Sequence, residues 1–496
     1  MAHRIEIDEL EKYLWDSAVL LRTSIDAGSY KQYIFPLLFF KRISDVYDEE
    51  TEQAKKEYGE DYEDFPEDHT FQIPSGSHWR DIRSCSENIG SSLVEAFHNI
   101  EKANPELLQG VFGDGAWTNK QRLPDSLLKD LIEHFSSKTL SIANCPEDEL
   151  GQGYEYLIKK FADDSGHTAQ EFYTNRTVVH LMTEILKPQS GESVYDPTCG
   201  SAGMLISCIA HLKNQGKEWR NLKIYGQEIN QLTSAIGRMN LFLHGVTDFK
   251  INNSNTLETP AFIENGKLQQ FDICLANPPY SIKQWNREAF ESDPYGRNFL
   301  GTPPQGRADY AFFQHILKSL KPDTGRCAIL FPHGILFRSE EDEMRKHLVE
   351  TDLVECVIGI GKNLFFNSPM SACIVICRTN KPIERKHKIL FIDAINEVTR
   401  KNSQSYLEAK HIEKIINSYI SFCNVEGFSS VINQNEILNN NSKLSVALYV
   451  RNNNVRNVSQ EELISTISEW ADDTLLLQSE YERINEMIKE DLNVAL

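Results

Sequence analysis

The stretch that decides the fold is Phe271-Asp272-Ile273-Cys274-Leu275-Ala276-Asn277-Pro278-Pro279-Tyr280. Its first six residues are a short apolar run, which predicts a buried strand. The last four residues then form a loop at the carboxyl end of that strand, where open α/β sheets place their ligands. Two consecutive prolines fix φ and remove two backbone donors, so the loop is stiff and its carbonyl groups are free to accept.

The chemistry of this loop suits an exocyclic amine. The side-chain oxygen of Asn277 and the carbonyl of Pro278 offer two acceptors to one NH2 group, and Tyr280 adds a flat face for a planar ring. The amine of a base is a poor nucleophile because its lone pair is delocalised into the ring. Two acceptors outside the ring plane would favour a pyramidal nitrogen and stabilise the positive charge that grows as it attacks. For these four residues alone, the alternative is an ordinary proline-rich turn.

A second motif lies upstream, Ser193-Val194-Tyr195-Asp196-Pro197-Thr198-Cys199-Gly200-Ser201-Ala202-Gly203-Met204-Leu205. It predicts a strand, a glycine-bearing turn and a helix. Gly200 and Gly203 let a ligand approach the backbone closely, and the helix start supplies N–H donors for a carboxylate. The next predicted strand leads to Glu228, where nucleotide-binding folds place an acidic residue that accepts hydrogen bonds from ribose hydroxyls. The alternative is a solvated glutamate at a strand end.

Predicted strands and helices alternate from about residue 175 to residue 377. This order predicts an α/β fold with a Rossmann-like, mainly parallel sheet and helices on both faces. Residues 1–150 instead predict helices, among them a buried one from Tyr33 to Val46, followed by a solvated connection or frayed helix at 48–68. We therefore expect a helical domain at 1–150, an α/β domain at 151–400 and a C-terminal region at 401–496.

The C-terminal region ends in a predicted amphipathic helix. Eight positions follow a four-three spacing, and seven of them are apolar. These positions are Leu463, Ile467, Trp470, Thr474, Leu477, Tyr481, Ile484 and Ile488. Such a seam is typical of coiled-coil packing. It packs either on a partner protein, which we favour, or on the N-terminal helices of this chain.

Composition limits the class of protein. The chain has 496 residues and a net charge of −21, so free duplex DNA should be repelled unless a local basic patch or a partner supplies phosphate contacts. No apolar run approaches 18 residues and the first ten residues are charged, which predicts neither a membrane span nor a signal peptide. Ten cysteines without Cys-x2-Cys pairs predict reduced thiols and no metal site. We expect a soluble cytoplasmic protein.

The connection from Ser281 to Arg307 is long and interleaves basic with aromatic residues. It contains Trp285, Arg287, Tyr295, Arg297 and Arg307. This pattern beside the Asn277–Tyr280 loop suits contact with a nucleic-acid strand. A lid that only shields the site is an equally good interpretation.

The motifs together resemble a known family. Glu171-Phe172-Tyr173-Thr174, then the Asp196–Gly203 turn, then Asn277–Tyr280 resemble the amino-group DNA methyltransferases whose cofactor motifs come first. The segments 325–338 and 363–369 also look like this family. The N-terminal pattern from Leu14-Trp15 to Ser44-Asp45 is similar to the helical domain of type I restriction-modification methyltransferase (M) subunits. The resemblance covers nearly the whole chain.

The resemblance implies a site-specific DNA adenine-N6 methyltransferase of a host-defence system, with S-adenosylmethionine as methyl donor. It implies that Asn277, Pro278, Pro279 and Tyr280 grip a flipped adenine. The residues implied in cofactor binding are Glu171, Phe172, Tyr173, Thr174, Asn175, Arg176, Asp196, Thr198, Gly200, Ser201, Ala202, Gly203, Glu228 and Asn255. The family usually has proline where this chain has Asn175, which bears on the edge of the pocket.

The resemblance also implies partners. Double-stranded DNA is bound within a complex that contains a specificity (S) subunit, a second M subunit and, for cleavage, a restriction (R) subunit. The alternatives are a solitary DNA adenine methyltransferase, a protein-glutamine methyltransferase that uses the same Asn-Pro-Pro-Tyr loop, and a non-catalytic scaffold that keeps the fold.

Overall fold

The computed structural model describes residues 4–22, 24–59, 65–164, 174–362, 364, 372–401 and 404–450. The chain up to Val450 clusters into one compact unit. Three expected cofactor residues, Glu171, Phe172 and Tyr173, lie outside the described residues, and so does the expected apolar seam from Leu463 to Ile488. The expected domain boundaries near residues 150 and 400 stay a prediction.

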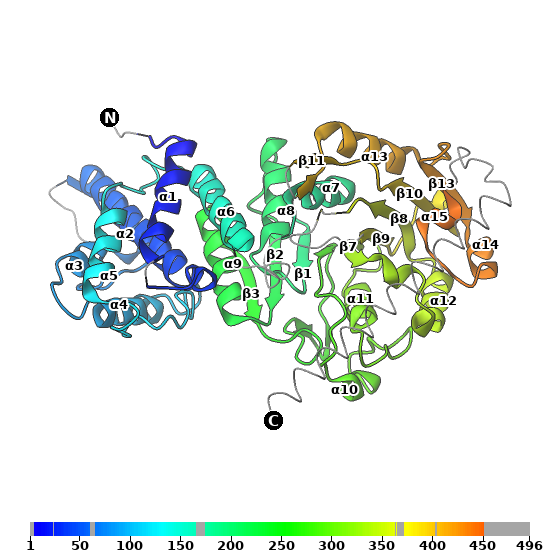
Figure 1. The fold of residues 1–496 in the computed structure, drawn as a ribbon, viewed down its shortest axis with the longest axis horizontal. Coiled ribbons are helices and arrows are strands. Elements are labelled where there is room, and N and C mark those ends of the chain that lie inside the picture. Colours follow the sequence, from blue (N-terminus) through cyan, green and yellow to red (C-terminus); the bar gives the residue numbers. More distant parts are fainter. Residues whose placement is uncertain are drawn as a thin grey trace, which may run out of the picture. The chain divides into compact units, whose positions relative to one another are not determined.

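The N-terminal third is helical, as the periodicity predicts. Its helices are α1 (Ile7–Leu21), α2 (Lys31–Tyr58), α3 (Trp79–Arg83), α4 (Ile89–Ala103), α5 (Asp125–Ser136) and α6 (Glu147–Asp164). They enclose one aromatic-rich core that also takes in Ala235, Ile236, Met239 and Phe242 of α9 (Gln231–Leu243). Figure 1 shows α1–α6 gathered beside α9. The helical region therefore shares its core with a helix of the α/β region.

Helix α2 is longer than the sequence predicts. The polar stretch after Asp48 was expected to be a connection or a frayed helix, but the helix continues to Tyr58. Its acidic side chains have partners on neighbouring segments. The Glu49 carboxylate accepts hydrogen bonds from the backbone N–H groups of Ile142 and Ala143, at 2.7 and 3.0 Å. These contacts stabilise a charged helix that composition alone marks as solvated.

A nine-stranded sheet forms the centre of the α/β region and confirms the predicted fold class. Its order is β13-β10-β8-β9-β7-β6-β1-β2-β3. The strands are β1 (Ser193–Asp196), β2 (Lys223–Glu228), β3 (Phe249–Asn253), β6 (Ile273–Ala276), β7 (Arg326–Pro332), β8 (Val354–Ile360), β9 (Ala372–Arg378), β10 (Lys388–Ala394) and β13 (Ser429–Asn433). Two short hairpins lie outside it: β4 (Ile263–Glu264) with β5 (Lys267–Leu268), and β11 (Thr399–Lys401) with β12 (Gln404–Tyr406).

The register brings the two sequence motifs to the same edge. β1 lies between β2 and β6, and all three are parallel. β9 and β13 are antiparallel to their neighbours, whereas β8 and β10 pair in parallel. Because β1, β2 and β6 run the same way, the turn after Asp196, the carboxylate of Glu228 and the loop after Ala276 lie at adjacent strand ends.

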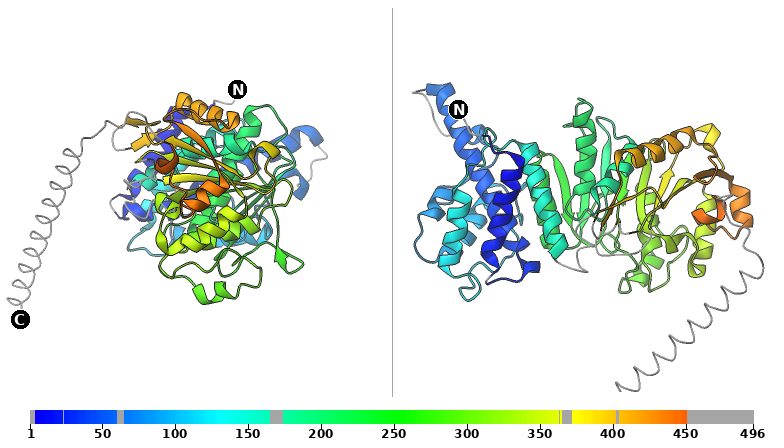
Figure 2. Two further views of the ribbon diagram at one scale, coloured as in Figure 1. Left: turned by 90° about the vertical axis from the view of Figure 1, so that its right-hand side faces the viewer. Right: turned by 45° about the horizontal axis from the view of Figure 1, so that its top comes forward.

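Helices cover both faces of the sheet. Side chains alternate along the strands, so Val194 and Ile273 join one core and Tyr195 and Cys274 join the other. The first core includes α7 (Arg176–Leu186), α8 (Gly203–Asn214) and α13 (Ala409–Ser421). The second includes α11 (Asp309–Lys318), α12 (Asp342–Glu350), α14 (Gln434–Asn439) and α15 (Val446–Tyr449). The turned view in Figure 2 shows the strands between these two groups.

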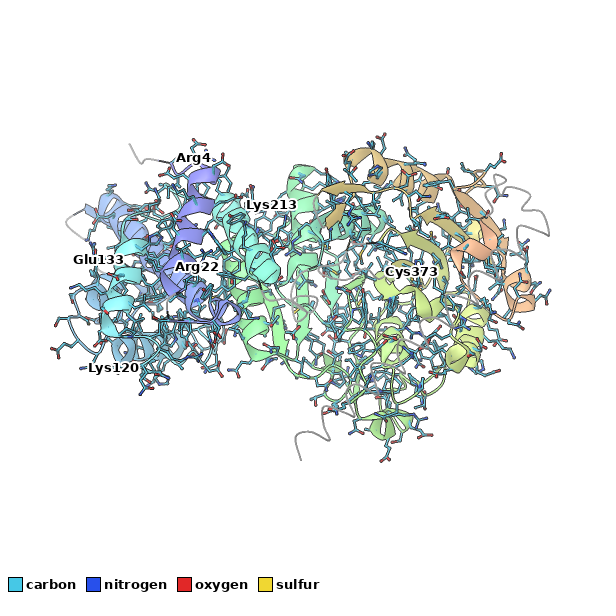
Figure 3. The ribbon with its side chains drawn as sticks, viewed as in Figure 1. Arg4, Arg22, Lys120, Glu133, Lys213 and Cys373 are labelled. Carbon is cyan, nitrogen blue, oxygen red and sulfur yellow. The ribbon has the colours of Figure 1, made fainter. Side chains whose placement is uncertain are left out.

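The region after residue 385 has a polar composition but contains a buried strand. β10 is an interior strand of the sheet, and its residues Ile389, Leu390, Phe391 and Ile392 are buried. All ten cysteines are free thiols and most are buried. Figure 3 shows Cys373 within the sheet. Among the described residues, no helix combines the length and apolar composition needed to cross a membrane.

Candidate active site

The glycine-bearing turn lies between β1 and α8 and contacts the end of β2. Gly200 has a φ of +52°, a conformation that glycine adopts without strain. Its N–H donates to Oε2 of Glu228 at 3.1 Å. One oxygen of the Asp196 carboxylate accepts from the N–H of Thr198 at 2.9 Å. The turn that the sequence predicts is present, and the predicted glutamate reaches it.

Gly203, at the start of α8, has no room for a side chain unless Arg176 moves. A Cβ atom there would lie 1.8 Å from Nη1 of Arg176, well inside any non-bonded contact. The Arg176 guanidinium is held by an ion pair with Glu155 on α6. Nδ2 of Asn240, on α9, donates to the same carboxylate at 2.7 Å and to the carbonyl of Ser201 at 2.8 Å. This network joins the turn to both helices.

Burial and charge set the pKa values of two carboxyl groups near the turn. Asp196 is 2% exposed, and burial raises its pKa to about 7, with a further contribution from the negative charge of Glu228. Burial also acts to raise the pKa of Glu155, but Arg176 and Asn240 outweigh it and hold that pKa below the ordinary value. Asp196 therefore changes charge near neutral pH, and a cation beside it would lower its pKa.

The Asn277–Tyr280 loop follows β6 at the same sheet edge. Nδ2 of Asn277 donates to Oγ1 of Thr174 at 3.1 Å, and its Oδ1 accepts from the hydroxyl of Tyr280 at 2.8 Å. Each end of the amide therefore has a partner. Burial raises the pKa of Tyr280 well above its usual range, so the hydroxyl keeps its proton and remains a donor at neutral pH.

Asn175, where the family usually has proline, caps helix α7. Its Oδ1 accepts from the N–H of Thr177 at 3.0 Å, and its Nδ2 donates to the carbonyl of Ser405 at 3.0 Å. Proline supplies neither contact. The neighbours Thr174 and Arg176 line a cavity beside the turn.

Two adjoining cavities bring the predicted residues together. The larger has a volume of about 950 Å³ and includes Pro197, Thr198, Glu228, Asn255 and the Asn277–Tyr280 loop. The smaller is lined by Thr174, Arg176, Asp196, Thr198, Cys199, Gly200, Ser201, Gly203, Met204 and Asn277. Thr198 and Asn277 border both. Ala202 is buried beneath the turn, with a φ of +64°, and it is not among the lining residues of either cavity.

Comparison with known proteins places the chain in a family. A profile of the family described as N-6 DNA Methylase matches residues 146–458, and one of the HsdM N-terminal domain matches residues 10–135. The first match covers more than half of the chain. The chain belongs to the N-6 DNA methylase family.

Type I restriction enzyme methylase subunits are similar to this N-6 DNA methylase over most of its length. The MjaVII methylase subunit of Methanocaldococcus jannaschii is 31% identical over 89% of this chain and 78% of that protein. The HindI methylase subunit of Haemophilus influenzae is 32% identical over 65% of this chain and 75% of that protein. A crystal structure of the type I restriction-modification methyltransferase subunit from Streptococcus thermophilus has 29% identity and a TM-score of 0.77, covering 90% of this chain and all of that one. The chain is a type I methylase subunit.

Members of this family use S-adenosylmethionine, and so does this N-6 DNA methylase. The residues present fit that molecule. The guanidinium of Arg176, which suits a carboxylate, lies against Gly203 in the lining of the smaller cavity, while Asp196 suits a cationic group. Glu228 lies at the end of β2 where a ribose diol is bound in related folds. Leu257 and Phe312 give the larger cavity apolar walls for a planar ring.

Several residues that line the larger cavity were not singled out from the sequence. They come from three separate segments: Leu257 after β3, Phe312 in α11, and His333, Phe337 and Arg338 after β7. The sequence gives a weak indication of the residues in 333–338, because this segment comes directly after β7, whose end lies at the same sheet edge. Glu155 was missed as well, since nothing in a helical repeat marks a glutamate that pairs with an arginine 21 positions later.

The Ser281–Arg307 connection is tied to the protein by its own arginines. Arg297 is 2% exposed and pairs with Asp293 at 2.6 Å. Its two terminal nitrogens also donate to the carbonyls of Thr256 and Leu257, at 2.9 and 2.8 Å. Arg297 therefore anchors the connection to the segment that carries Asn255, and its guanidinium is engaged inside the protein instead of facing a nucleic-acid strand.

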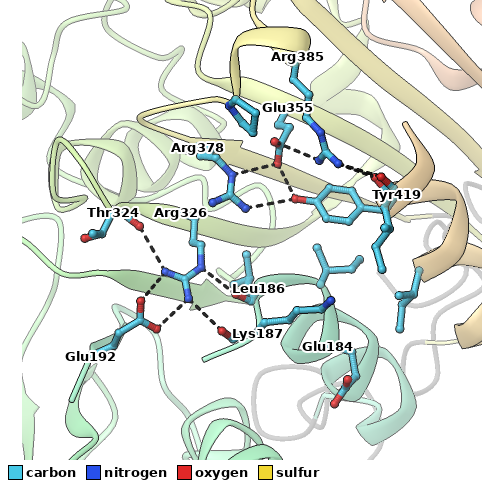
Figure 4. A pocket seen from close by; sticks show the side chains of 14 residues that line it. Glu184, Leu186, Lys187, Glu192, Thr324, Arg326, Glu355, Arg378, Arg385 and Tyr419 are labelled. Carbon is cyan, nitrogen blue, oxygen red and sulfur yellow. Dashed lines mark hydrogen bonds and ion pairs between the residues drawn. The ribbon is translucent and has the colours of Figure 1, made fainter. Parts of the chain in front are cut away.

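Another cavity, of about 490 Å³, lies at the opposite sheet edge, where β1 and β7 begin. Arg326 pairs there with Glu192, while Glu355 pairs with Arg378 and Arg385 (Figure 4). None of the predicted site residues lines it, and Arg326, Glu192, Glu355, Arg378 and Arg385 are engaged in these ion pairs. The candidate active site is the pair of cavities at the carboxyl ends of β1, β2 and β6.

Proposed function

We propose that this methylase subunit transfers a methyl group to the N6 atom of an adenine that is turned out of a DNA helix. One observation carries the proposal. Asn277, an acceptor suited to an amine, borders both the cavity beside the Gly200–Gly203 turn and the larger cavity. A cofactor that reaches from the turn into the larger cavity, and a base bound in the larger cavity, would meet at this side chain.

The proposed cofactor contacts follow from the charges around the turn. Arg176 and the N–H groups at the start of α8 would bind the carboxylate of S-adenosylmethionine, and Asp196 would face its cationic groups. Glu228 already accepts from the N–H groups of Gly200 and Asn230, at 3.1 and 2.8 Å. A ribose hydroxyl would donate to this carboxylate. Thr198, Ser201 and Asn255 would complete the pocket, with Glu171, Phe172 and Tyr173 at its edge.

The proposed base contacts come from the Asn277–Tyr280 loop. Oδ1 of Asn277 has a second lone pair beyond the one that Tyr280 uses, so it can accept from the amine. The carbonyl of Pro278 would accept the second amine hydrogen. Pro279 keeps the loop stiff, and the ring of Tyr280 would stack on the base.

These contacts account for the chemistry. When bound, S-adenosylmethionine supplies an electrophilic methyl group on a sulfonium. Asn277 and Pro278 orient the lone pair of the amine toward that methyl group and stabilise the positive charge that develops on nitrogen. Because the amide of Asn277 already has partners at both ends, little reorganisation accompanies the reaction.

We further propose that DNA is bound only in a complex. A chain of net charge −21 lacks the excess of Lys and Arg that phosphate neutralisation needs. A specificity subunit would read the DNA site, a second M subunit would complete the methylase, and a restriction subunit would add cleavage. The helix predicted between Leu463 and Ile488 would dock on the specificity subunit.

The test is a methyl-transfer assay with the full chain, its co-encoded specificity subunit, duplex DNA and S-adenosylmethionine. Digestion of the DNA and mass spectrometry of the nucleosides should reveal N6-methyladenine. The chain alone should give none above background. Methylation of cytosine, or of protein glutamine in place of DNA, would contradict the proposal.

A further inference from the structure

The residue that follows the Asn277–Tyr280 loop has an unusual backbone conformation. Ser281 has a φ of +51°, in the left-handed region that residues with a Cβ disfavour. Its N–H donates to Oδ1 of Asp309 at 3.0 Å. Its hydroxyl accepts from Nη1 of Arg307 at 3.2 Å. Side chains outside the loop therefore hold Ser281 in a conformation that it would otherwise leave.

Asp309 is a buried carboxylate at the first residue of α11. Its side chain is 1% exposed, and its Oδ2 accepts from Nη1 of Arg338 at 2.8 Å. The same nitrogen lies 3.2 Å from Oε1 of Glu341, whose side chain is fully buried. One guanidinium thus bridges two buried carboxylates, and its positive charge offsets the burial of Asp309.

This arrangement joins three segments that are distant in sequence. It links the loop after β6, the start of α11 and the segment that follows η5 (His333–Leu336). Arg307 and Arg338 also line the larger cavity. Ser281 directly follows Tyr280, whose hydroxyl is bonded to Asn277. A change in the backbone at Ser281 would therefore move Tyr280 and, through its hydroxyl, the amide of Asn277.

We propose that Asp309 is a positioning residue for methyl transfer, holding Ser281 in the conformation that keeps Tyr280 and Asn277 in place. This inference rests on the proposed function. Asp309 acts through the N–H of Ser281, not by touching the reacting atoms. The competing explanation is that Asp309 only stabilises α11, because an acidic residue in the first turn of a helix interacts favourably with the helix dipole.

Hydrogen exchange on the free full-length chain tests the structural half of the proposal without DNA or cofactor. In Asp309→Ala, the amides of 277–286 should exchange about tenfold faster or more, because Ser281 loses its acceptor. Glu343→Gln is the matched control, since Glu343 is an exposed acidic residue in the first turn of α12. Exchange that is faster only within α11, or unchanged at 277–286, would overturn the proposal.

Kinetics of the complex with the specificity subunit test the functional half. Asp309→Ala should lower kcat by about tenfold to a hundredfold, as expected for a small misplacement of reacting groups, with little change in the KM for S-adenosylmethionine. Adding Ser281→Gly should recover most of that loss, because glycine adopts a positive φ without an external partner. Loss of helix stability in α11 would not be repaired by a change in another segment.

The two proposals fail in different ways. If the wild-type complex transfers no methyl group, or Asn277→Ala is fully active, the proposed function is wrong while the exchange experiment still decides the role of Asp309. If the wild type is active and Asn277→Ala is not, but Asp309→Ala matches wild type or the double variant shows no recovery, the role of Asp309 is wrong. Asp309→Asn, which keeps an oxygen for Ser281, should lose less activity than Asp309→Ala.

Discussion

The hydroxyl of Tyr280 donates a hydrogen bond of 2.8 Å to Oδ1 of Asn277. The sequence predicts a tyrosine whose ring stacks on a base, but it does not predict this second contact. Together with the bond from Nδ2 to Thr174, it orients the amide of Asn277 through both of its ends. Tyr280 would therefore serve the proposed reaction both with its ring and with its hydroxyl.

Substitution of Tyr280 separates these contributions. Tyr280→Phe keeps the ring and loses the hydroxyl, so we expect a loss of about 1 kcal/mol, or roughly fivefold in the single-turnover rate. Tyr280→Ala should lose stacking as well, by about 1–3 kcal/mol more. Single-turnover methyl transfer in the assembled complex measures both. Equal rates for the two variants would mean that the ring has no part in base capture.

Asn277→Ala removes the acceptor for the developing charge. We expect the methyl-transfer rate to fall by about a hundredfold or more, a few kcal/mol of barrier, while binding of S-adenosylmethionine survives. Asn214→Ala, at the exposed end of α8, is the control. Rates come from the transfer assay and binding from calorimetry. An unchanged rate in Asn277→Ala would place the reaction elsewhere.

A side chain at Gly203 should abolish cofactor binding. The added Cβ would collide with the guanidinium of Arg176, so Arg176 must leave the turn. Gly203→Leu should therefore bind S-adenosylmethionine at least about a hundredfold more weakly, which corresponds to about 3 kcal/mol. Gly28→Ala is the control, since a Cβ there meets nothing within 4 Å. Wild-type affinity in Gly203→Leu by calorimetry would refute the assignment.

The buried carboxyl of Asp196 predicts a pH-dependent stability. Its pKa is about 7 in the folded chain and about 3.9 when unfolded. A raised folded pKa stabilises the protein fully below the unfolded value, and that contribution is lost as pH rises to about 7. Between pH 5 and pH 8 the wild type should therefore lose about 3 kcal/mol of unfolding free energy relative to Asp196→Asn. Urea unfolding of both proteins across this range measures the difference, and parallel pH profiles would contradict the burial argument.

Truncation after Asn457 tests the predicted partner helix. Burial of about seven large side chains there could contribute on the order of 10 kcal/mol before ordering costs. The shortened chain should bind S-adenosylmethionine normally but fail to co-purify with the specificity subunit. Co-purification of the truncated chain would show that the partner binds elsewhere.

Much of the fold was predictable because it depends on local patterns. Apolar periodicity predicted α9 and the strands on either side of it, and glycine spacing predicted the turn at Gly200. Composition did not predict that the polar second half of α2 is helical, or that β10 is a buried strand. Each depends on neighbours that are distant in sequence. The ion pair of Glu155 with Arg176 was not predictable for the same reason.

In the candidate site, too, features set by local patterns were predictable and features set by distant contacts were not. The parallel direction of the strands, which places Asp196, Glu228 and Asn277 at strand ends on one edge, follows from an alternating α/β pattern, whereas the strand order does not. The contact of Asp309 with Ser281 and the anchoring of Arg297 do not, since they require the path of a long connection. Sequence motifs therefore predicted the residues proposed to carry the chemistry, but not those that hold them in position.

The central claim is that this methylase subunit methylates adenine in DNA through Asn277. Modification-sensitive sequencing of DNA from cells that carry this chain with its co-encoded subunits tests it most directly, against cells that carry Asn277→Ala or lack the chain. We expect N6-methyladenine at one recurring sequence with the wild type and at none of these sites with the other two. The same methylation pattern in all three would contradict the claim.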